Sequence, residues 1–285
     1  MILSGVVVVC LAVMRFAVLD ALTIQDAAAG AAMSAQFGWP HRPEDWTWFL
    51  RLGHGVAWRE NGRLAGTAMW FPLDEAHASI GLVQVAPDMQ GRGLGRRLMH
   101  AVIDAAGDRS LMLHATPEGA ALYASLGFKP GAGVQQWQGM VTPPECRSAG
   151  IRMATANDHA AIARLDHEAT GLQRCAALAA LLGDGVIVVA EADSKMTGFA
   201  VRRSFGRGGL IGPIVAPDIA IAEALAGSLA TPGFQRMDLA GPALSAFARD
   251  RGLSCVGEVM AMSTGDWPAP AGPAVRLAVA SQALG

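Results

Sequence analysis

Hydrophobic and polar positions in the first half of the chain follow a pattern that predicts a mostly antiparallel sheet with helices packed on it. The predicted elements are a strand at 15–19, a helix at 23–36, a short helix opened by Pro43, a hairpin of 55–59 with 64–71, and a strand at 77–86. The hairpin turns at Asn61-Gly62, the strongest short turn signal, because both residues tolerate a positive φ. Three antiparallel strands are therefore expected in this region.

After residue 86 the pattern changes to helices that alternate with strands. It predicts a helix at 92–106, a strand at 110–115, a helix opened by Thr116-Pro117, and a last strand pair through 135–137. Leu94, Leu98 and Val102 share one face of the helix at 92–106. Because that helix carries the chain back, strand 110–115 should lie parallel to strand 77–86.

The second half repeats this order after a proline-marked linker at 143–150. Its predicted elements are a strand at 151–153, a helix capped by Asn157-Asp158, a hairpin of 185–191 with 196–203, a strand at 209–217, a helix at 219–229, a strand at 236–239 and a helix at 242–251. Residues 269–285 predict either a final strand around 275–279 or a loose tail. We therefore predict two α/β (α+β) domains, at 14–142 and 151–285.

The composition is that of a globular protein with 52% hydrophobic and 16% charged residues in 285. A formal net charge of -2 argues against a nucleic-acid binder, which needs a basic surface, and favours a small substrate. Cys10, Cys146, Cys175 and Cys255 form no CxxC pair. They are typical of buried thiols in a reducing compartment, so we expect a cytoplasmic protein without a disulfide or a structural zinc.

Residues 1–13 are an uncharged apolar run that contains four consecutive valines. The run is too short to span a bilayer and lacks the positive charges of a secretory signal, so we expect no membrane association. One interpretation is a start codon assigned upstream of the true one, in which case Met14 opens the protein. The other is a genuine extra strand or anchor.

The most informative segment is Gln90-Gly91-Arg92-Gly93-Leu94-Gly95, which follows an apolar strand and Pro87 and precedes a helix. Its glycines allow a tight turn and close approach of a ligand to the backbone. Unpaired N–H groups at the start of the helix can then bind phosphate oxygens. The spacing is neither GxGxxG nor GxxxxGK[ST]. No acidic residue ends a strand about twenty residues later, where a dinucleotide-binding fold places the side chain that binds the ribose. A dinucleotide-binding oxidoreductase is therefore disfavoured.

About thirty residues later comes Leu122-Tyr123-Ala124-Ser125-Leu126-Gly127-Phe128, which holds the single tyrosine of the chain. Together, the glycine-rich segment and this segment resemble the acyl-CoA-binding region of the GNAT superfamily of N-acetyltransferases. The resemblance covers about residues 15–140. It implies a fold of two tandem GNAT units, each with a mixed, mostly antiparallel twisted sheet, a splayed parallel strand pair and flanking helices.

The resemblance also implies how acetyl-CoA would bind. In the family, the pantetheine arm of coenzyme A pairs with strand backbone in the gap between the splayed strands. The cofactor-binding residues that this implies here are Val83, Val85, Gln90, Gly91, Arg92, Gly93, Leu94, Gly95 and Thr116. Thr116 stands where many relatives have a cofactor-contacting asparagine. An alternative is that its hydroxyl serves as a helix cap and does not contact the cofactor. No metal is implied.

Catalytic roles follow from the resemblance with one departure. Tyr123 matches the tyrosine that protonates the leaving thiolate in family members, although it could also be a half-buried aromatic residue of the core. Ser79 stands where some relatives carry a glutamate base, and a serine cannot be a base alone. The local candidates for the base are Asp74, Glu75, His77, His114 and Glu118. Trp39 and His77 are candidate acceptor-substrate residues, and Trp39, Trp46 and Trp48 could equally be core.

The second half lacks this chemistry. No glycine follows Pro217-Asp218, and Ala248 aligns with Tyr123. It resembles the degenerate C-terminal GNAT-like domain of tandem acetyltransferases, which packs beside the first and shapes its acceptor pocket.

The implied function is an N-acetyltransferase that moves an acetyl group from acetyl-CoA to a primary amine of a small molecule, by direct transfer in a ternary complex. The alternative is a non-catalytic acyl-CoA sensor. The sequence does not determine whether the protein forms a homodimer.

Overall fold

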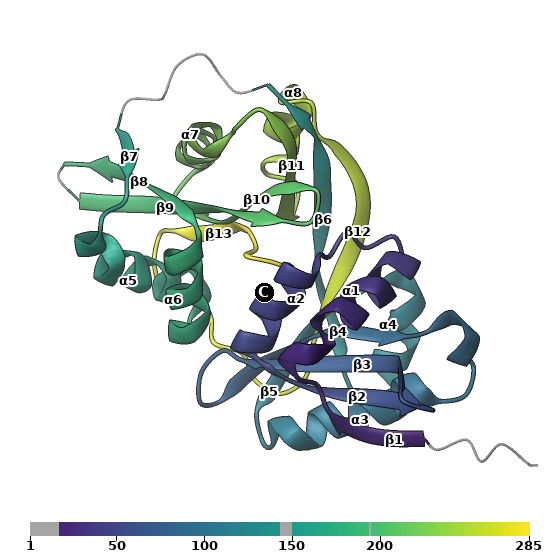
Figure 1. The fold of residues 1–285 in the computed structure, drawn as a ribbon. Helices are drawn as coiled ribbons and strands as arrows, with labels where there is room; N and C mark the ends of the chain where they lie inside the picture. The colour runs from purple at the N-terminus through teal and green to yellow at the C-terminus, as the bar shows by residue number, and fades with distance from the viewer. Residues whose placement is uncertain (1–16, 143–149, 194) are drawn as a thin grey trace, which may run out of the picture.

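The computed structural model describes residues 17–142, 150–193 and 195–285, in which thirteen strands form one continuous sheet accompanied by eight α-helices. The sheet runs in the order β1-β2-β3-β4-β5-β12-β6-β11-β13-β10-β9-β8-β7. The two ends of this sheet belong to the two halves of the chain, and its long middle strands pass between them (Figure 1). The predicted extension at 1–13 and nearly all of the predicted linker lie outside the described residues.

The first half has the predicted order of elements. They are β1 (Ala17–Ala21), α1 (Ala27–Gln36), α2 (Pro43–Leu52), β2 (His54–Glu60), β3 (Arg63–Pro72), β4 (His77–Val85), α3 (Leu94–Ala106), β5 (Ser110–Ala115), α4 (Pro117–Ser125) and β6 (Lys129–Val141). The β2–β3 hairpin turns where expected, with φ of +52° at Asn61 and +78° at Gly62. β4 and β5 are parallel, as the intervening helix requires.

The second half repeats the order with two additions. Its elements are β7 (Ile151–Met153), α5 (His159–Thr170), α6 (Cys175–Asp184), β8 (Val186–Ala192), β9 (Lys195–Phe205), β10 (Gly208–Ala216), α7 (Ile219–Leu229), β11 (Gly233–Ala240), α8 (Ser245–Asp250), β12 (Ser254–Ser263) and β13 (Val275–Ala278). α6 and β12 were not predicted. α6 is almost wholly apolar and β12 mixes polar and apolar positions, so neither shows a clear period.

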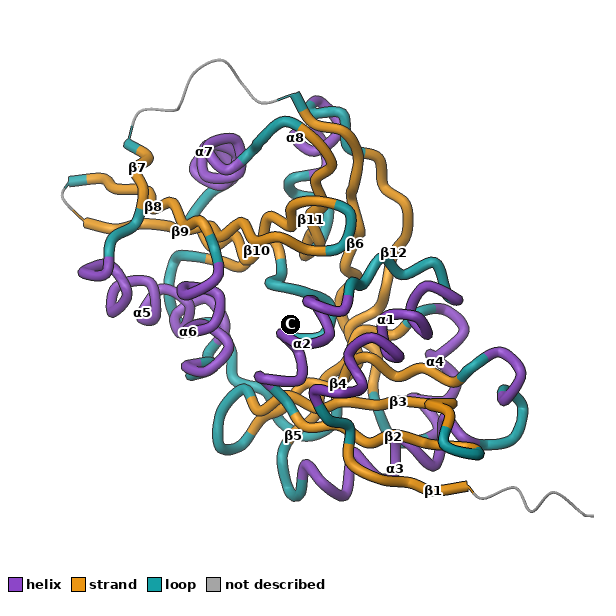
Figure 2. The backbone as a smooth tube through the Cα atoms, viewed as in Figure 1, coloured by secondary structure: helices purple, strands orange, loops and turns teal. Residues whose placement is uncertain are grey.

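The middle of the sheet corrects one prediction. Residues 129–141 are not part of a strand pair of the first half but form one long strand, β6, with both neighbours from the second half. β11 pairs with it on one side and β12 on the other, and β12 in turn pairs with β5 (Figure 2). The second half therefore does more than pack beside the first, because it supplies a strand between β5 and β6.

The buried apolar side chains form separate clusters under the helices of the two halves. One apolar cluster under α3 includes Leu98 and Val102 of its predicted face together with Met99, and another under α7 includes Leu225 and Leu229. No helix in the described ranges is long and apolar enough to cross a bilayer. Cys175 and Cys255 are exposed free thiols, which corrects the prediction of buried ones.

Candidate active site

A cavity of about 790 Å³ lies where β4 separates from β5. The two strands pair only from His77 to Ile80, after which β5 continues against β12. From Gly81 onward, the edge of β4 that faced β5 has no partner strand among the described residues. Backbone from Ile80 to Val85 lines the cavity, so the predicted splayed strand pair is present and forms one of its walls.

A bulge at Leu82 accompanies the separation. Leu82 has φ +52°, an uncommon value for a non-glycine residue, and β4 holds one extra residue against β3 at this point. The hydroxyl of Thr67 on β3 donates to the Leu82 carbonyl at 2.7 Å and both residues are buried. The hydrogen bond holds the strained backbone in place, as is common at functional sites.

The glycine-rich segment forms the end of this cavity. Gly91 and Gly93 have φ of +74° and +75°, the left-handed region that glycine adopts without strain. In the described chain, the N–H groups of residues 91–96 have no backbone acceptor, whereas N–H of Arg97 donates to the Gly93 carbonyl. A row of free donors at the start of α3 therefore lies at the cavity, as an anion site requires.

The arginines of this segment differ from the prediction. Arg92 is exposed, its Nη2 donates to the Asp88 carbonyl, and it does not line the cavity. Arg96 does line it, and its Nη2 donates to Ser125 Oγ on α4 at 2.9 Å. The cationic side chain at this end of the cavity is thus Arg96. The Gln90 side chain donates to the Val85 carbonyl, which ties the segment to the end of β4.

Tyr123 reaches the cavity from α4. Its ring packs edge-on to Phe128, with centroids 6.3 Å apart, and against Gly119, where an added Cβ would lie 2.8 Å from Cε2. Burial raises the pKa of Tyr123 to about 12, so the phenol is protonated at neutral pH. It is a proton donor held in one position.

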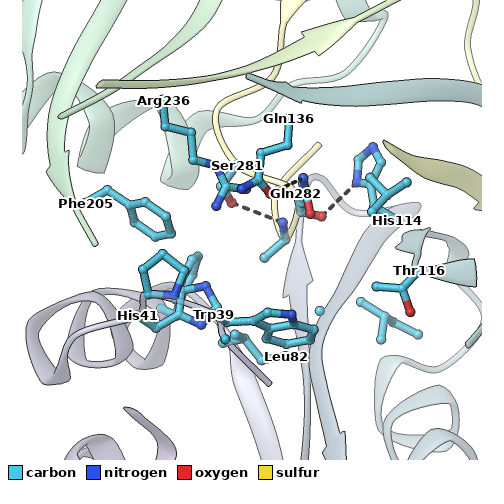
Figure 3. A pocket seen from close by; sticks show the side chains of 17 residues that line it. Trp39, His41, Leu82, His114, Thr116, Gln136, Phe205, Arg236, Ser281 and Gln282 are labelled. Atoms are coloured by element: carbon cyan, nitrogen blue, oxygen red, sulfur yellow. Dashed lines mark hydrogen bonds between the residues drawn. The ribbon is translucent and has the colours of Figure 1, made fainter. Parts of the chain in front are cut away.

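A smaller cavity of about 180 Å³ adjoins the larger one and lies between the two halves. Six residues line both, and they are Trp39, Ile80, Gly81, Leu82, His114 and Thr116. Figure 3 shows His114 and Thr116 at one end of the smaller cavity and His41, Phe205 and Arg236 toward the other. Residues 281–283, near the end of the chain, form part of its wall.

His114 on β5 stands at the junction of the two cavities. Its Nδ1 lies 2.7 Å from the Gln282 carbonyl, which can only accept, so Nδ1 carries the proton. Burial lowers the pKa of His114, with the Gln282 carbonyl opposing this in part, so the ring is neutral at neutral pH. Its Nε2 is then a free proton acceptor.

Most of the predicted site residues line the larger cavity. These are Trp39, Val83, Val85, Gln90, Gly91, Gly93, Leu94, Gly95, Thr116 and Tyr123. Thr116 is the N-cap residue of α4, but its side chain makes no capping hydrogen bond. Trp46 is fully buried in the core of the first half.

Ser79 and His77 are not brought to either cavity. Both lie in the part of β4 that still pairs with β5, before the gap opens. The Ser79 hydroxyl donates to the Ala283 carbonyl, and His77 is held by Asp74 Oδ1 at 2.8 Å. Their contacts are structural.

The corresponding gap of the second half is closed by the chain itself. β10 and β11 are parallel for two residue pairs and then separate, like β4 and β5. β13 lies in the opening, antiparallel to both strands. A Cβ at Gly212 would lie 2.2 Å from the Val279 carbonyl oxygen, so the glycine permits this close passage. Among the described residues, β13 therefore occupies the position that is open between β4 and β5.

Several residues of the site escaped the sequence analysis. His41, Phe205, Arg236 and the segment 281–283 meet at the smaller cavity from four separate parts of the chain. The cluster of tryptophans around His41 was the one local signal. Nothing in the sequence near Arg236 or Gln282 indicates a site.

Comparisons with known proteins agree with this geometry. Residues 25–128 match the family model described as "Acetyltransferase (GNAT) family", and residues 162–272 match "Acetyltransferase (GNAT) domain". A search among curated proteins found no match.

Solved structures show the fold. A putative acetyltransferase from Pyrococcus horikoshii is 18% identical, with a TM-score of 0.79 over 94% of this chain and 96% of that chain. A tandem GNAT protein from the clavulanic acid biosynthesis pathway is 16% identical, with a TM-score of 0.64 over 89% and 100%. A GCN5-related N-acetyltransferase from Sphaerobacter thermophilus is 17% identical, with a TM-score of 0.63 over 90% and 98%.

The two family models together span well over half of the chain, one in each of its halves. The chain thus belongs to the GNAT acetyltransferase family and carries two GNAT folds in tandem.

Proposed function

We propose that this protein is an N-acetyltransferase that moves an acetyl group from acetyl-CoA to a primary amine of a small molecule. Acyl-CoA-dependent transfer is general to the GNAT family. The observation that carries the proposal is the junction of two cavities at the splayed strands, one fit for the cofactor and the other for an acceptor.

The larger cavity suits coenzyme A on three grounds. Free N–H groups of residues 91–96 can hold the pyrophosphate, with Arg96 beside them. The unpaired edge of β4 from Gly81 to Val85 can hydrogen-bond an extended pantetheine arm in the manner of an added strand. The cavity is also within the size range of ligand sites, roughly 300–1,000 Å³.

Bound acetyl-CoA would supply a thioester as the acetyl donor, with a thiolate as the leaving group. His114 is the group that we assign as general base, because its neutral Nε2 can take the proton of an amine in the smaller cavity. Tyr123 is the group that we assign as general acid, because its protonated phenol lines the cofactor cavity. Both groups must stay within reach of the splayed end of β4, where the two cavities share a wall.

A non-catalytic acyl-CoA sensor is the second candidate, since such a protein needs only the larger cavity. The smaller cavity and the orientation of His114 by Gln282 favour the enzyme.

The test combines calorimetry with acetyl-CoA and a thiol-release assay over a panel of small amines. We expect binding, and release of CoA thiol that depends on the amine. Binding without release in any amine would favour the sensor, and the absence of binding would overturn both candidates.

A further inference from the structure

The far end of the smaller cavity holds two hydrogen-bond donors that the proposed transfer does not use. They are His41, which follows α1, and Arg236 on β11. Both lie against Phe205, with the His41 ring centroid and the Arg236 Cζ each 5.4 Å from its ring centroid. Neither residue lines the larger cavity, whereas His114 lines both. The two donors therefore lie at the end of the smaller cavity that is away from His114 and from the larger cavity.

The hydrogen bonds around Ser34 determine which nitrogen of His41 carries the proton. Trp46 Nε1 and Gln84 Nε2 each donate to the fully buried Ser34 Oγ, at 3.1 and 2.8 Å. With the Gln84 amide nitrogen on Ser34 Oγ, the hydroxyl proton is left for His41 Nδ1, which lies 3.0 Å away and accepts it. Nε2 of His41 is therefore the protonated nitrogen, and in the described chain it has no acceptor.

Burial lowers the pKa of His41 to about 4, and Arg236 adds to this effect. The ring is thus neutral at neutral pH and keeps this tautomer. His41 and His114 present opposite hydrogen-bonding groups to the cavity. His41 offers an N–H donor, and His114 offers a nitrogen lone pair as an acceptor.

Arg236 offers a second donor. Its Nε and Nη2 donate to the buried carboxylate of Asp238, at 3.0 and 2.9 Å. Its Nη1 has no acceptor among the residues that the structure describes, and the side chain lines the cavity, as Figure 3 shows. The pairing with Asp238 holds the guanidinium in place and leaves one N–H edge for a ligand.

The charged side chains around this end are largely paired. Asp238 balances Arg236, and Asp45 balances Arg42, to which it is bonded at 2.9 Å. Arg203, only 4% exposed, has its Cζ 4.8 Å from the Phe205 ring centroid but lines a separate cavity together with Glu44, Asp45 and Asp184. The free donors of His41 and Arg236, the second on a charged guanidinium, favour an anionic group in the smaller cavity.

We propose that the acceptor carries a carboxylate as well as its amine, and that His41 and Arg236 bind the carboxylate while the amine faces His114. This inference rests on the proposed acetyl transfer. The volume of about 180 Å³ lies below the usual range for ligand sites, which favours an acceptor of the size of an amino acid over a peptide or an oligosaccharide.

The first experiment needs no variant. Matched sets of acceptors are compared by thiol release: amino acids of increasing amine-to-carboxylate distance, their carboxamides and their decarboxylated amines. We expect the carboxylate form of at least one spacing to exceed its carboxamide and its amine about 10- to 100-fold in kcat/KM, the range of a hydrogen bond to a charged group. Equal or faster reaction of the forms without a carboxylate would overturn this inference and leave the proposed function standing.

Two variants then locate the effect. Arg236→Lys keeps a positive charge beside Asp238 but removes the free guanidinium edge, and His41→Phe keeps the ring but removes the N–H donor. We expect either change to raise KM for the carboxylate acceptor about 10-fold or more, with little change in KM for the decarboxylated amine. An equal rise for both acceptors would overturn the assignment of these residues.

Arg207→Gln is the matched control. Arg207 is an exposed arginine of the second half that also stacks on a phenylalanine, with Cζ 4.4 Å from the Phe234 ring centroid, and it lines neither cavity. It should leave the preference for the carboxylate unchanged. If no acceptor releases thiol although acetyl-CoA binds, the proposed transfer fails and this inference fails with it.

Discussion

At the scale of single residues, surroundings rather than residue type decide the roles at the site. The chain presents two histidines to one small cavity, and their hydrogen-bond partners make one a donor and the other an acceptor. Ser34 donates to His41, whereas the Gln282 carbonyl accepts from His114. The single tyrosine is kept protonated by burial on the cofactor side. The same three residue types on an exposed surface would have none of these properties.

The proposed role of His114 as general base predicts a pH dependence. Because its pKa lies below the ordinary value of about 6.5, the base form persists below pH 6.5 and is lost only on further acidification. The profile of kcat/KM should therefore fall on the acid side below pH 6.5, measured with an arylamine acceptor that stays neutral throughout.

His114→Gln should lower kcat about 100- to 10,000-fold and abolish this acid limb. An unchanged limb in the variant would contradict the assignment of His114 as the base.

The proposed role of Tyr123 as general acid predicts that its removal lowers turnover without lowering cofactor affinity. Tyr123→Phe removes the phenol proton but keeps the ring against Phe128 and Gly119, so we expect kcat to fall about 100-fold or more. Because the pKa is raised to about 12, the wild-type enzyme should show no alkaline loss from this group up to about pH 10. Unchanged turnover in Tyr123→Phe, measured by thiol release, would remove the acid role.

At the scale of elements, backbone geometry forms most of the proposed cofactor site. β4 offers an unpaired edge because it parts from β5 after Ile80, and α3 offers free N–H groups because Gly91 and Gly93 turn the chain with positive φ. Side chains contribute less, since Arg92 points to the Asp88 carbonyl instead of the cavity. In the second half the same two elements exist, but β13 fills the gap between them.

Because backbone groups contribute more than side chains to the proposed site, substitutions in the glycine-rich segment should differ in their effects. A valine at Gly93 must adopt a left-handed conformation that costs about 1–3 kcal/mol, and a side chain at Gly95 meets Leu122 Cδ2 at 3.3 Å. Calorimetry should show acetyl-CoA affinity falling roughly 5- to 150-fold or more for Gly93→Val and Gly95→Val. Arg92→Ala is the comparison and should lose much less. Equal affinities of the three variants would argue against recognition by the backbone.

At the scale of the whole molecule, the two GNAT folds share one sheet. β12 of the second half lies between β5 and β6, and β6 lies between β12 and β11, so each half provides neighbours for strands of the other. The segment at 279–285 passes from β13 into the first half, where Ala283 accepts from Ser79 and Gln282 accepts from His114. The smaller cavity, which we propose for the acceptor, therefore exists only in the assembled molecule.

The shared sheet predicts a single unfolding transition despite the tandem organisation. Most of the seven tryptophans precede residue 71, so their fluorescence reports the first half, while far-UV circular dichroism reports both. The two signals should coincide during denaturation by urea. Two separated transitions would show that the halves unfold independently.

A pair of glycine variants sharpens this test. A Cβ at Gly139 on β6 would lie 2.5 Å from the Gly252 carbonyl oxygen, whereas a Cβ at Gly257 on β12 meets nothing within 4 Å. Gly139→Ala should lower the free energy of unfolding by about 1–3 kcal/mol in both signals equally. Gly257→Ala is the control and should change it far less.

Local patterns were enough to predict most elements and most of the residues that line the larger cavity. Short segments with a characteristic spacing contain the turn at Asn61-Gly62, the glycines at 91–95 and Tyr123. Their local sequence was therefore enough to indicate where they would lie. The predictions failed where a residue depends on a distant partner. Ser79 and His77 lie in the paired part of β4, and Arg92 turns outward beside Arg96, which lines the cavity. α6 and β12 showed no clear period and were missed.

The sequence by itself determined the family, the tandem order of elements and the glycine-rich turn before α3, because these depend on local spacing and on periodic burial. Only the tertiary structure decided which strands lie in the middle of the sheet, that β13 lies in the second gap, and which groups line the smaller cavity. His41, His114, Arg236 and Gln282 are far apart along the chain. Their protonation states and free hydrogen-bonding groups depend on contacts that form only when the two halves fold together.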